Sequence, residues 1–389
     1  MADTSSHEPA ADTLRRSPLH GAHADAGARF APFGGWAMPV EYAAGGVLAE
    51  HAAVRERIGL FDVSHLGTVL VHGPGALGHV DRVLSNSLQR LVDGQAQYTL
   101  CLDPDGRIVD DLIVYRVSAD DLVLVPNAAN AAAVVAALRV DLPEGVQVLD
   151  VHEEVAVVAV QGPRVEAVMA SAGLPHGHEY MSFVVVEEAV EPVATGAGRT
   201  VVCRTGYTGE RGYEVLVPAA GALRLWQRLL AAVVSHGGMP AGLGARDTLR
   251  TEMGYPLHGN DIGGDVTPVQ AGLGFAVGWK KPAFVGRDVV LAEKAAGPAR
   301  RASGLLAVGR GVPRAGMGVH LLDGDGLGRR VGTTTSGTFS PTLRTGIALA
   351  LLDADSQLGP DDEVAVDVRG RPLRCRVARA PFVPSHVRG

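Results

Sequence analysis

The stretch GRIVDDLIVYRV, from Gly106 to Val117, follows an Asp-Pro-Asp-Gly turn and is rich in the β-branched and aliphatic residues of a strand. Two adjacent acids, Asp110 and Asp111, lie in its middle. Because successive side chains of a strand point to opposite faces, one acid can face water while the other faces whatever the strand covers. Asp111 shares the more apolar face with Ile113 and Tyr115, where a carboxylate is costly unless it has a partner or a task. Asp111 is therefore the first candidate functional residue, and Asp110→Asn is expected to be near neutral.

Composition limits the classes of protein that the chain can belong to. Its 389 residues are enough for two or three domains, and 47% hydrophobic with 20% charged residues is ordinary for a globular protein. A net charge of −7 argues against a nucleic-acid binder. The three cysteines are far apart, which favours a reducing compartment, and there is no signal peptide or membrane-length apolar run. We expect a cytoplasmic protein without nucleic-acid or membrane partners.

The pattern along the chain predicts an α+β protein. Residues up to about Ser17 are polar and expected to be disordered, and Ala31 to Tyr42 is interpreted as an irregular ordered loop. A helix is expected from Val47 to Ile58 and a strand from Phe61 through Val71. From about Arg301 onward, short strands separated by turns predict a small antiparallel barrel or sandwich, with a domain boundary near 295–300.

Motifs for metal or nucleotide binding have simpler explanations. The acids from Asp103 to Asp111 lack the closing glutamate of a calcium loop, and a hairpin turn explains the Asp-Gly pair equally well. The glycine-rich segments do not stand between a strand and a helix, so the dinucleotide fingerprint is absent. No metal site is expected.

Histidines offer one candidate. His20, His23, His176 and His178 lack the acid or cysteine partners of a metal site and are interpreted as loop residues. His65 is equally compatible with a polar contact in a site and with a satisfied core histidine.

Two further charged positions remain open at this stage. Arg246 and Asp247, followed by Arg250 and Glu252, form either a solvated helical charge ladder or a helix start whose arginine grips a carboxylate. Glu214 is an acid within the apolar run of a strand.

Taken together, these segments resemble the aminomethyltransferase of the glycine cleavage system, the T-protein, and its folate-dependent relatives. The resemblance extends over nearly the whole chain from about Leu19. Its matching segments are PFGGWAMPVEY (Pro32–Tyr42), GLFDVSHLG (Gly59–Gly67), GRIVDDLIVYRV (Gly106–Val117), VQGP (Val160–Pro163), RTGYTGERGYEV (Arg204–Val215), AGLGARDTLRTEMGYPLHGNDI (Ala241–Ile262), TPVQAGLG (Thr267–Gly274), FVGRD (Phe284–Asp288), TSGTFSPTL (Thr335–Leu343) and PFVP (Pro381–Pro384).

The resemblance implies three domains in a cloverleaf around a central channel for tetrahydrofolate, with a C-terminal β-barrel-like domain. It implies an α+β domain from 1–62 plus 151–241, a ferredoxin-like α+β domain from 63–150 plus 242–297, and the barrel from 298–389. The implied reaction passes the methylene of an S-aminomethyl group, carried by the lipoyl arm of H-protein, to tetrahydrofolate and releases ammonia.

The resemblance also implies roles for individual residues. Asp111 maps onto the key catalytic acid. Tyr98 and Tyr207 map onto tyrosines that pack on the cofactor, and Asn127 maps onto an asparagine suited to the pteridine edge. Glu214 maps onto the acid that binds the amino and ring NH groups of the pterin, and Arg246 maps onto an arginine that grips the cofactor or substrate.

Four departures from the family pattern keep alternatives open. They are Leu66, Arg211, His258 and Val387. They leave room for a folate-dependent demethylase or methylene transferase that acts on a free small molecule. A non-catalytic folate-binding assembly factor is disfavoured, because such relatives carry Lys-Gly-Cys-Tyr where this chain has Arg204 to Tyr207.

Overall fold

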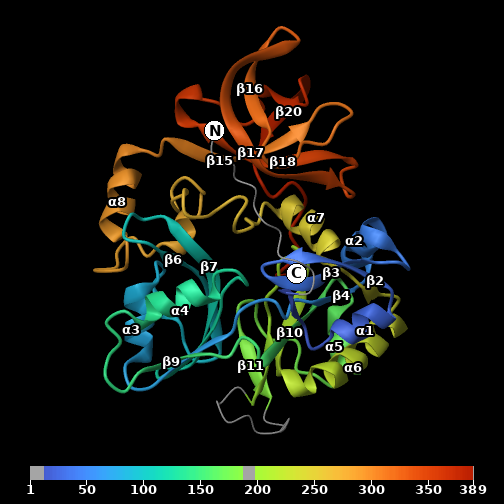
Figure 1. The fold of residues 1–389 in the computed structure, drawn as a ribbon, viewed down its shortest axis with the longest axis vertical. Coiled ribbons are helices and arrows are strands. Elements are labelled where there is room, and N and C mark those ends of the chain that lie inside the picture. Colours follow the sequence, from blue (N-terminus) through green and yellow to red (C-terminus); the bar gives the residue numbers. More distant parts are fainter. Residues whose placement is uncertain (1–12, 187–197, 389) are drawn as a thin grey trace.

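The computed structural model describes residues 13–186 and 198–388. Three bodies surround a central space, with the six-stranded barrel at the top and two α+β bodies below it (Figure 1). Within the described residues no helix is long and apolar enough to cross a membrane.

The first body is built on a six-stranded sheet. Its strand order is β11 (Phe183–Val186), β12 (Thr200–Cys203), β13 (Gly212–Pro218), β10 (Val155–Gln161), β4 (Gly59–Asp62) and β14 (Met239–Pro240). All of β10 is buried, as expected for a hydrophobic strand that is covered on both faces. Helices α1 (His20–Asp25), α5 (Val165–Ser171) and α6 (Ala222–Ser235) pack on one of these faces.

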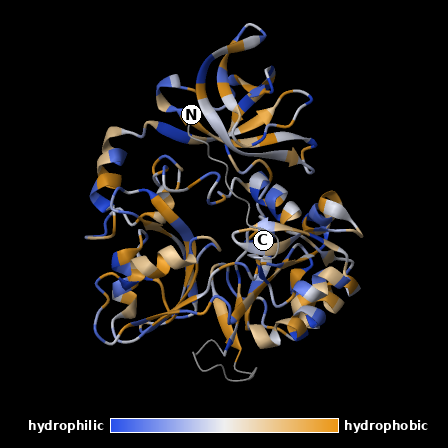
Figure 2. Ribbon diagram, in the orientation of Figure 1, coloured by the Kyte–Doolittle hydropathy of each residue, from blue (hydrophilic) through white to orange (hydrophobic). Residues whose placement is uncertain are grey.

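The second body is an antiparallel five-stranded sheet. Its strand order is β6 (Gln95–Leu102), β7 (Ile108–Ser118), β8 (Asp121–Val125), β5 (Val69–His72) and β9 (Gln147–Asp150). Helices α3 (Ala76–Val83) and α4 (Ala131–Arg139) cover one face. The opposite face shares a hydrophobic core with the first sheet, and this core includes Tyr115 from the second sheet and Phe61 from the first. Figure 2 shows the hydrophobic runs along the strands of both sheets.

The C-terminal body is a closed barrel, which confirms the predicted fold class. Its strand order is β15 (Arg300–Ala307), β18 (Thr345–Asp353), β17 (Gly326–Ser340), β16 (Gly318–Asp323), β19 (Glu363–Val368) and β20 (Arg371–Ala378). Helix α8 (Arg287–Ala296) precedes it. Because each sheet and the barrel has its own core, we propose the division into 1–62 plus 151–241, 63–150 plus 242–297, and 298–389; residues 1–12, 187–197 and 389 of it lie outside the described residues.

Helix α7 (Leu243–Met253) joins the bodies. It contacts helix α2 (Gly46–Glu56) of the first body and strands β17 and β18 of the barrel. Seven of its residues are buried, four of them polar or charged, which is unusual for a helix at a surface. The polar contacts of α7 therefore lie between bodies and not in solvent.

Several sequence expectations are wrong. The segment Ala31 to Tyr42 is not a loop but part of a hairpin, β2 (Ala28–Phe33) and β3 (Trp36–Tyr42). Its turn is Gly34-Gly35, and both residues have positive φ (56° and 84°), which is the geometry that a two-residue hairpin turn requires.

The single strand expected from Phe61 through Val71 is two strands in different sheets. β4 ends at Asp62 in the first body and β5 begins at Val69 in the second, with a turn between them. A run of apolar residues does not reveal where the chain passes from one sheet to another.

Part of the N-terminal segment expected to be disordered has defined structure, and its residues 1–12 lie outside the described residues. Strand β1 (Arg15–Arg16) pairs with β3, and Ser17 donates a hydrogen bond to Asp62 at 2.5 Å. His23 is not a loop residue; it lies in α1, where its ring bonds Asp62 at 2.9 Å and Tyr42 at 2.9 Å.

Candidate active site

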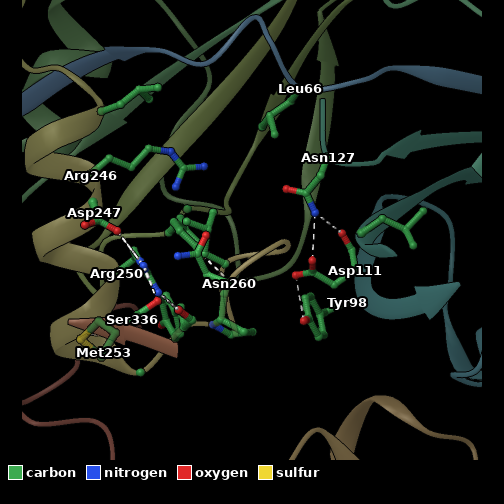
Figure 3. A pocket seen from close by; sticks show the side chains of 18 of the residues that line it. Leu66, Tyr98, Asp111, Asn127, Arg246, Asp247, Arg250, Met253, Asn260 and Ser336 are labelled. Carbon is green, nitrogen blue, oxygen red and sulfur yellow. Dashed lines mark hydrogen bonds and ion pairs between the residues drawn. The ribbon is translucent and has the colours of Figure 1, made fainter. Parts of the chain in front are cut away.

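A cavity of about 1050 Å³ lies where the three bodies meet. Such a volume is at the upper end of the range for small-molecule and cofactor sites. Each body contributes side chains to its wall: Tyr98 and Asp111 from the second, Thr205 and Glu214 from the first, and Arg314 and Ser336 from the barrel. Figure 3 shows Tyr98, Asp111 and Asn127 facing Arg246 across it.

Asp111 lies on the cavity face of β7, as strand parity predicts. Its two carboxylate oxygens are held from different sides, because Tyr98 Oη donates to Oδ2 at 2.9 Å and Asn127 Nδ2 donates to Oδ1 at 2.9 Å (Figure 3). Burial raises the pKa of Asp111, while the hydrogen bond from Tyr98 opposes that rise. The result is an oriented carboxylate at a cavity wall.

Asp110 contradicts the expectation for the other acid. It is fully buried, on the face of β7 that packs with Leu112 and Val114 beneath the helices. It accepts hydrogen bonds from the backbone N of Asn127 at 2.9 Å, from Asn127 Nδ2 at 2.9 Å and from Asn130 Nδ2 at 2.7 Å. A near-neutral Asp110→Asn substitution is therefore not expected.

Glu214 reaches the cavity from β13. Thr205 Oγ1 donates to Glu214 Oε2 at 2.6 Å, and the second carboxylate oxygen has no hydrogen-bond partner among the described residues. Glu214 can therefore still accept hydrogen bonds from a ligand.

Tyr207 and Arg246 form one unit on the opposite wall. The Tyr207 hydroxyl donates to the Pro256 carbonyl, and the Arg246 guanidinium lies 4.2 Å from the centre of its ring. Burial lowers the pKa of Arg246, which stays cationic because an arginine pKa is far above neutrality. Its guanidinium has no hydrogen-bonded acceptor in the part of the chain that the structure describes, so its donors are available to a ligand.

The loop that carries Tyr207 is fixed by Gln161. Gln161 Nε2 donates to the Thr205 carbonyl at 3.2 Å, and Thr208 Oγ1 donates to Gln161 Oε1 at 2.8 Å. A Cβ at Gly206 would lie 2.1 Å from Gln161 Oε1, so a larger residue would displace the Gln161 side chain that holds the loop. The Gly-Tyr-Thr-Gly sequence thus positions Tyr207 through close packing.

His65 and Phe275 also line the cavity. His65 is 2% exposed, and burial, aided by the nearby Arg246, holds its pKa well below the ordinary value. Its Nδ1 has no partner within the described residues, so it is a neutral imidazole at the wall. Phe275 is 71% exposed and stacks on Tyr98 with ring centres 5.7 Å apart. Sequence reasoning missed Phe275, since it lies in a single-turn 3-10 helix, η4 (Gly274–Ala276), that has no local pattern.

Helix α7 has features of both interpretations of its charged residues, the helical charge ladder and the arginine that grips a carboxylate. Arg250 pairs with Asp247 at 2.7 Å, as a helical charge ladder predicts, but it is buried and also bonds Asp261 at 2.7 Å and Ser336 at 2.8 Å. The solvated interpretation is therefore wrong for Arg250, which ties α7 to the barrel.

Among the departures, Leu66 lines the cavity. Arg211 instead pairs with Glu166 at 2.5 Å, and the Val387 carbonyl accepts a hydrogen bond from Arg204 at 2.9 Å.

The fold and the cavity together define the class of the protein: an α+β enzyme with a C-terminal barrel. Its cavity carries a hydrogen-bond acceptor, Glu214, and a donor, Arg246, that have atoms without partners among the described residues. Residues 19–281 match the family model described as the GCVT N-terminal domain. Residues 300–384 match the glycine cleavage T-protein C-terminal barrel domain.

Individual relatives agree with the family models. An aminomethyltransferase of Parafrankia sp. (strain EAN1pec) is 56% identical over 96% of this chain and 99% of its own length. One from Mycobacterium avium (strain 104) is 55% identical, covering 95% and 97%. The crystal structure of glycine cleavage system aminomethyltransferase T from Bartonella henselae matches with a TM-score of 0.87 at 35% identity, covering 96% of this chain and 99% of that one. The chain belongs to the glycine cleavage T-protein family of aminomethyltransferases.

Proposed function

We propose that this protein transfers the methylene of an S-aminomethyl group, carried on the lipoyl arm of H-protein, to tetrahydrofolate and releases ammonia. The observation that carries this proposal is the oriented Asp111 carboxylate in a cavity that also holds the available groups of Glu214 and Arg246. The buried free cysteines of the protein are compatible with a cytoplasmic location.

The groups at the cavity wall fit tetrahydrofolate. The pterin presents an edge of amino and ring NH donors, and Glu214 has a carboxylate oxygen without a partner among the described residues. Tyr98 and Tyr207 offer aromatic surface for a planar ring system. Arg246 supplies a cation for the anionic end of the folate or for the substrate.

The chemistry needs a carboxylate beside the transferred carbon. Tetrahydrofolate supplies the nitrogen nucleophiles that accept the one-carbon unit. Asp111 can accept a hydrogen bond from the attacking N–H, which orients it, and its negative charge stabilises positive charge that develops as sulfur departs. Tyr98 and Asn127 keep the carboxylate in that orientation.

A reconstituted assay tests the proposal. Purified protein, tetrahydrofolate and aminomethylated H-protein are mixed, and ammonia and methylene-folate are followed. We expect both products in equal amounts. Turnover with a methylated small molecule, and none with H-protein, would instead assign the chain to the folate-dependent demethylases.

A further inference from the structure

Asp110 contributes hydrogen bonds that the proposed chemistry does not use directly. It is fully buried and accepts from three N–H groups of the segment that follows β8, yet it adjoins the candidate catalytic acid. Burying a second carboxylate beside Asp111 costs free energy through desolvation and repulsion between like charges. A neutral side chain would avoid this cost, whereas a carboxylate supplies two oxygens that can accept several hydrogen bonds.

Asn130 directs its side chain to Asp110 and not to the helix that it precedes. It is the N-cap residue of α4, where asparagine ordinarily bonds the backbone N–H groups of its own helix. Here it makes no capping hydrogen bond, and its amide is directed to Asp110 at 2.7 Å instead.

Asn127 links the two acids. Its Nδ2 lies 2.9 Å from Asp110 Oδ1, 2.9 Å from Asp111 Oδ1 and 2.9 Å from the Asp111 backbone carbonyl, so the amide nitrogen faces both acids. Its amide oxygen consequently points away from Asp111 into the cavity (Figure 3). The two ends of an asparagine amide have nearly the same shape, so only the hydrogen-bond partners decide which end points where.

We propose that Asp110 is a positioning residue that fixes the orientation of the Asn127 amide. Burial and the neighbouring Asp111 raise the pKa of Asp110 to about 7. Above that pH its ionised carboxylate accepts hydrogen bonds only, so it holds the Nδ2 end toward the acids and the oxygen toward the ligand. Asp110 thereby orients Asp111 through Asn127 and makes Asn127 an acceptor for donor groups of the bound folate. This proposal rests on the proposed function for the identity of the ligand.

The substitution Asp110→Asn separates this role from packing. An asparagine at 110 that presents its NH2 group to Asn127 sets two donors against each other, and rotation of the Asn127 amide would remove this repulsion while ending its hydrogen bonds to the Asp111 carboxylate and carbonyl. Asp111 then loses a donor, and Asn127 offers the ligand a donor where an acceptor was needed. We expect kcat to fall roughly 10- to 100-fold, the range seen when a partner of a functional side chain is removed, and the folate Kd to rise. Asp105→Asn, an exposed acid on the same hairpin, is the matched control and should change neither.

The pH profile of kcat distinguishes rotation of the Asn127 amide from the loss of the Asp110 charge alone. Removal of a neighbouring negative charge would by itself move the acid limb of kcat, which reports Asp111, to lower pH. Loss of the Asn127 donor moves it to higher pH, because that hydrogen bond favours the ionised carboxylate. The other groups that act on Asp111 electrostatically are Tyr98, Tyr207, Arg246 and His258, and the substitution alters none of them. A shift to lower pH, or none, would overturn the proposal.

A double-mutant cycle gives a second, independent outcome. If Asp110 acts through Asn127, then Asp110→Asn should have little further effect on kcat in an Asn127→Ala background. Multiplicative losses would overturn the proposal.

Neutron diffraction of the wild-type folate complex covers the case in which Asp110→Asn does not fold. We expect both deuterons of the Asn127 amide on the side of the acids, and deuterons directed at the ligand would overturn the proposal. Folate binding and the neutron map do not require turnover, so an inactive wild-type protein would contradict the proposed reaction and leave these two tests intact.

Discussion

Two clusters of charged side chains differ in how many of their polar atoms already have hydrogen-bond partners within the protein. At the junction of α2, α7 and the barrel, Glu252 is fully buried and accepts from Arg55 at 2.8 Å, from Ser340 at 2.5 Å and from the backbone and side chain of Thr342. At the cavity, Glu214 and Arg246 lie at the wall with polar atoms that have no partner among the described residues. Glu252 and its partners form a saturated cluster that joins the bodies. Glu214 and Arg246 form a cavity cluster that keeps hydrogen-bonding capacity for a ligand.

This difference separates stability from function for residues of the same type. A buried carboxylate whose partners all belong to the protein can only contribute to the folded state. One that faces a cavity with an open acceptor can also interact with a substrate. Substitutions in the two clusters should therefore affect different measurements.

The largest effect is expected at Asp111. Asp111→Asn keeps the shape of the side chain but removes the charge beside the reacting carbon. Turnover should fall by roughly two to four orders of magnitude, as for a lost charge-stabilising or acid–base group, while the folate Kd changes little. Steady-state kinetics and equilibrium binding measure the two quantities. Unchanged turnover would remove Asp111 from its role, and Asp105→Asn is the control.

In the saturated cluster, Arg55→Met should act on stability. It leaves Glu252 buried without its cation, so the free energy of unfolding should drop by about 3–5 kcal/mol, measured by denaturant titration. The matched control is Arg29→Met, which breaks an exposed pair with Glu41 and should cost less than about 1 kcal/mol. Equal losses from both variants would contradict the distinction between the clusters.

Glu214→Gln should weaken folate binding more than it weakens folding. A hydrogen bond to a charged acceptor contributes about 1.5–3 kcal/mol, which corresponds to a roughly 10- to 150-fold rise in Kd. Isothermal titration calorimetry measures the affinity, and thermal unfolding checks that the fold is intact. Glu179→Gln, at an exposed position, should bind as the wild type does. Wild-type affinity in Glu214→Gln would exclude contact with the pterin.

The smallest effect is a displacement of the pH profile. Burial raises the pKa of Asp111, so the active carboxylate is lost as pH falls through a value above the ordinary 3.8. Tyr98→Phe removes a donor that favours the ionised form, so the acid limb of kcat should move to still higher pH. Tyr255→Phe, which changes another cavity tyrosine, should leave the limb in place. A limb that stays in place in Tyr98→Phe would mean that the Tyr98 bond is absent in solution.

The sequence predicts one of the two acids well and the other poorly. Parity along β7 correctly places Asp111 on the face opposite Asp110. It does not show that α3 and α4 cover the Asp110 face, because that covering depends on elements distant in sequence. Asp110 was therefore expected to tolerate substitution, and its three hydrogen bonds contradict this.

The same dependence on elements distant in sequence decides which other features of the structure could be predicted. The barrel was predictable because turn-separated strands are a local pattern. The β2–β3 hairpin also has a local signal, the Gly34-Gly35 pair, which the aromatic and proline residues around it obscured. Arg250 and Phe275 have no such signal, since their contacts with Ser336 and Tyr98 join residues that are distant in sequence.

A crystal structure of this chain with bound tetrahydrofolate tests the central claim most directly. We predict the pterin amino edge on the Glu214 carboxylate and a folate nitrogen that accepts the one-carbon unit within about 2.6–3.2 Å of Asp111, directly or through one water. Folate bound outside this cavity, or bound with Asp111 out of reach of those nitrogens, would contradict it.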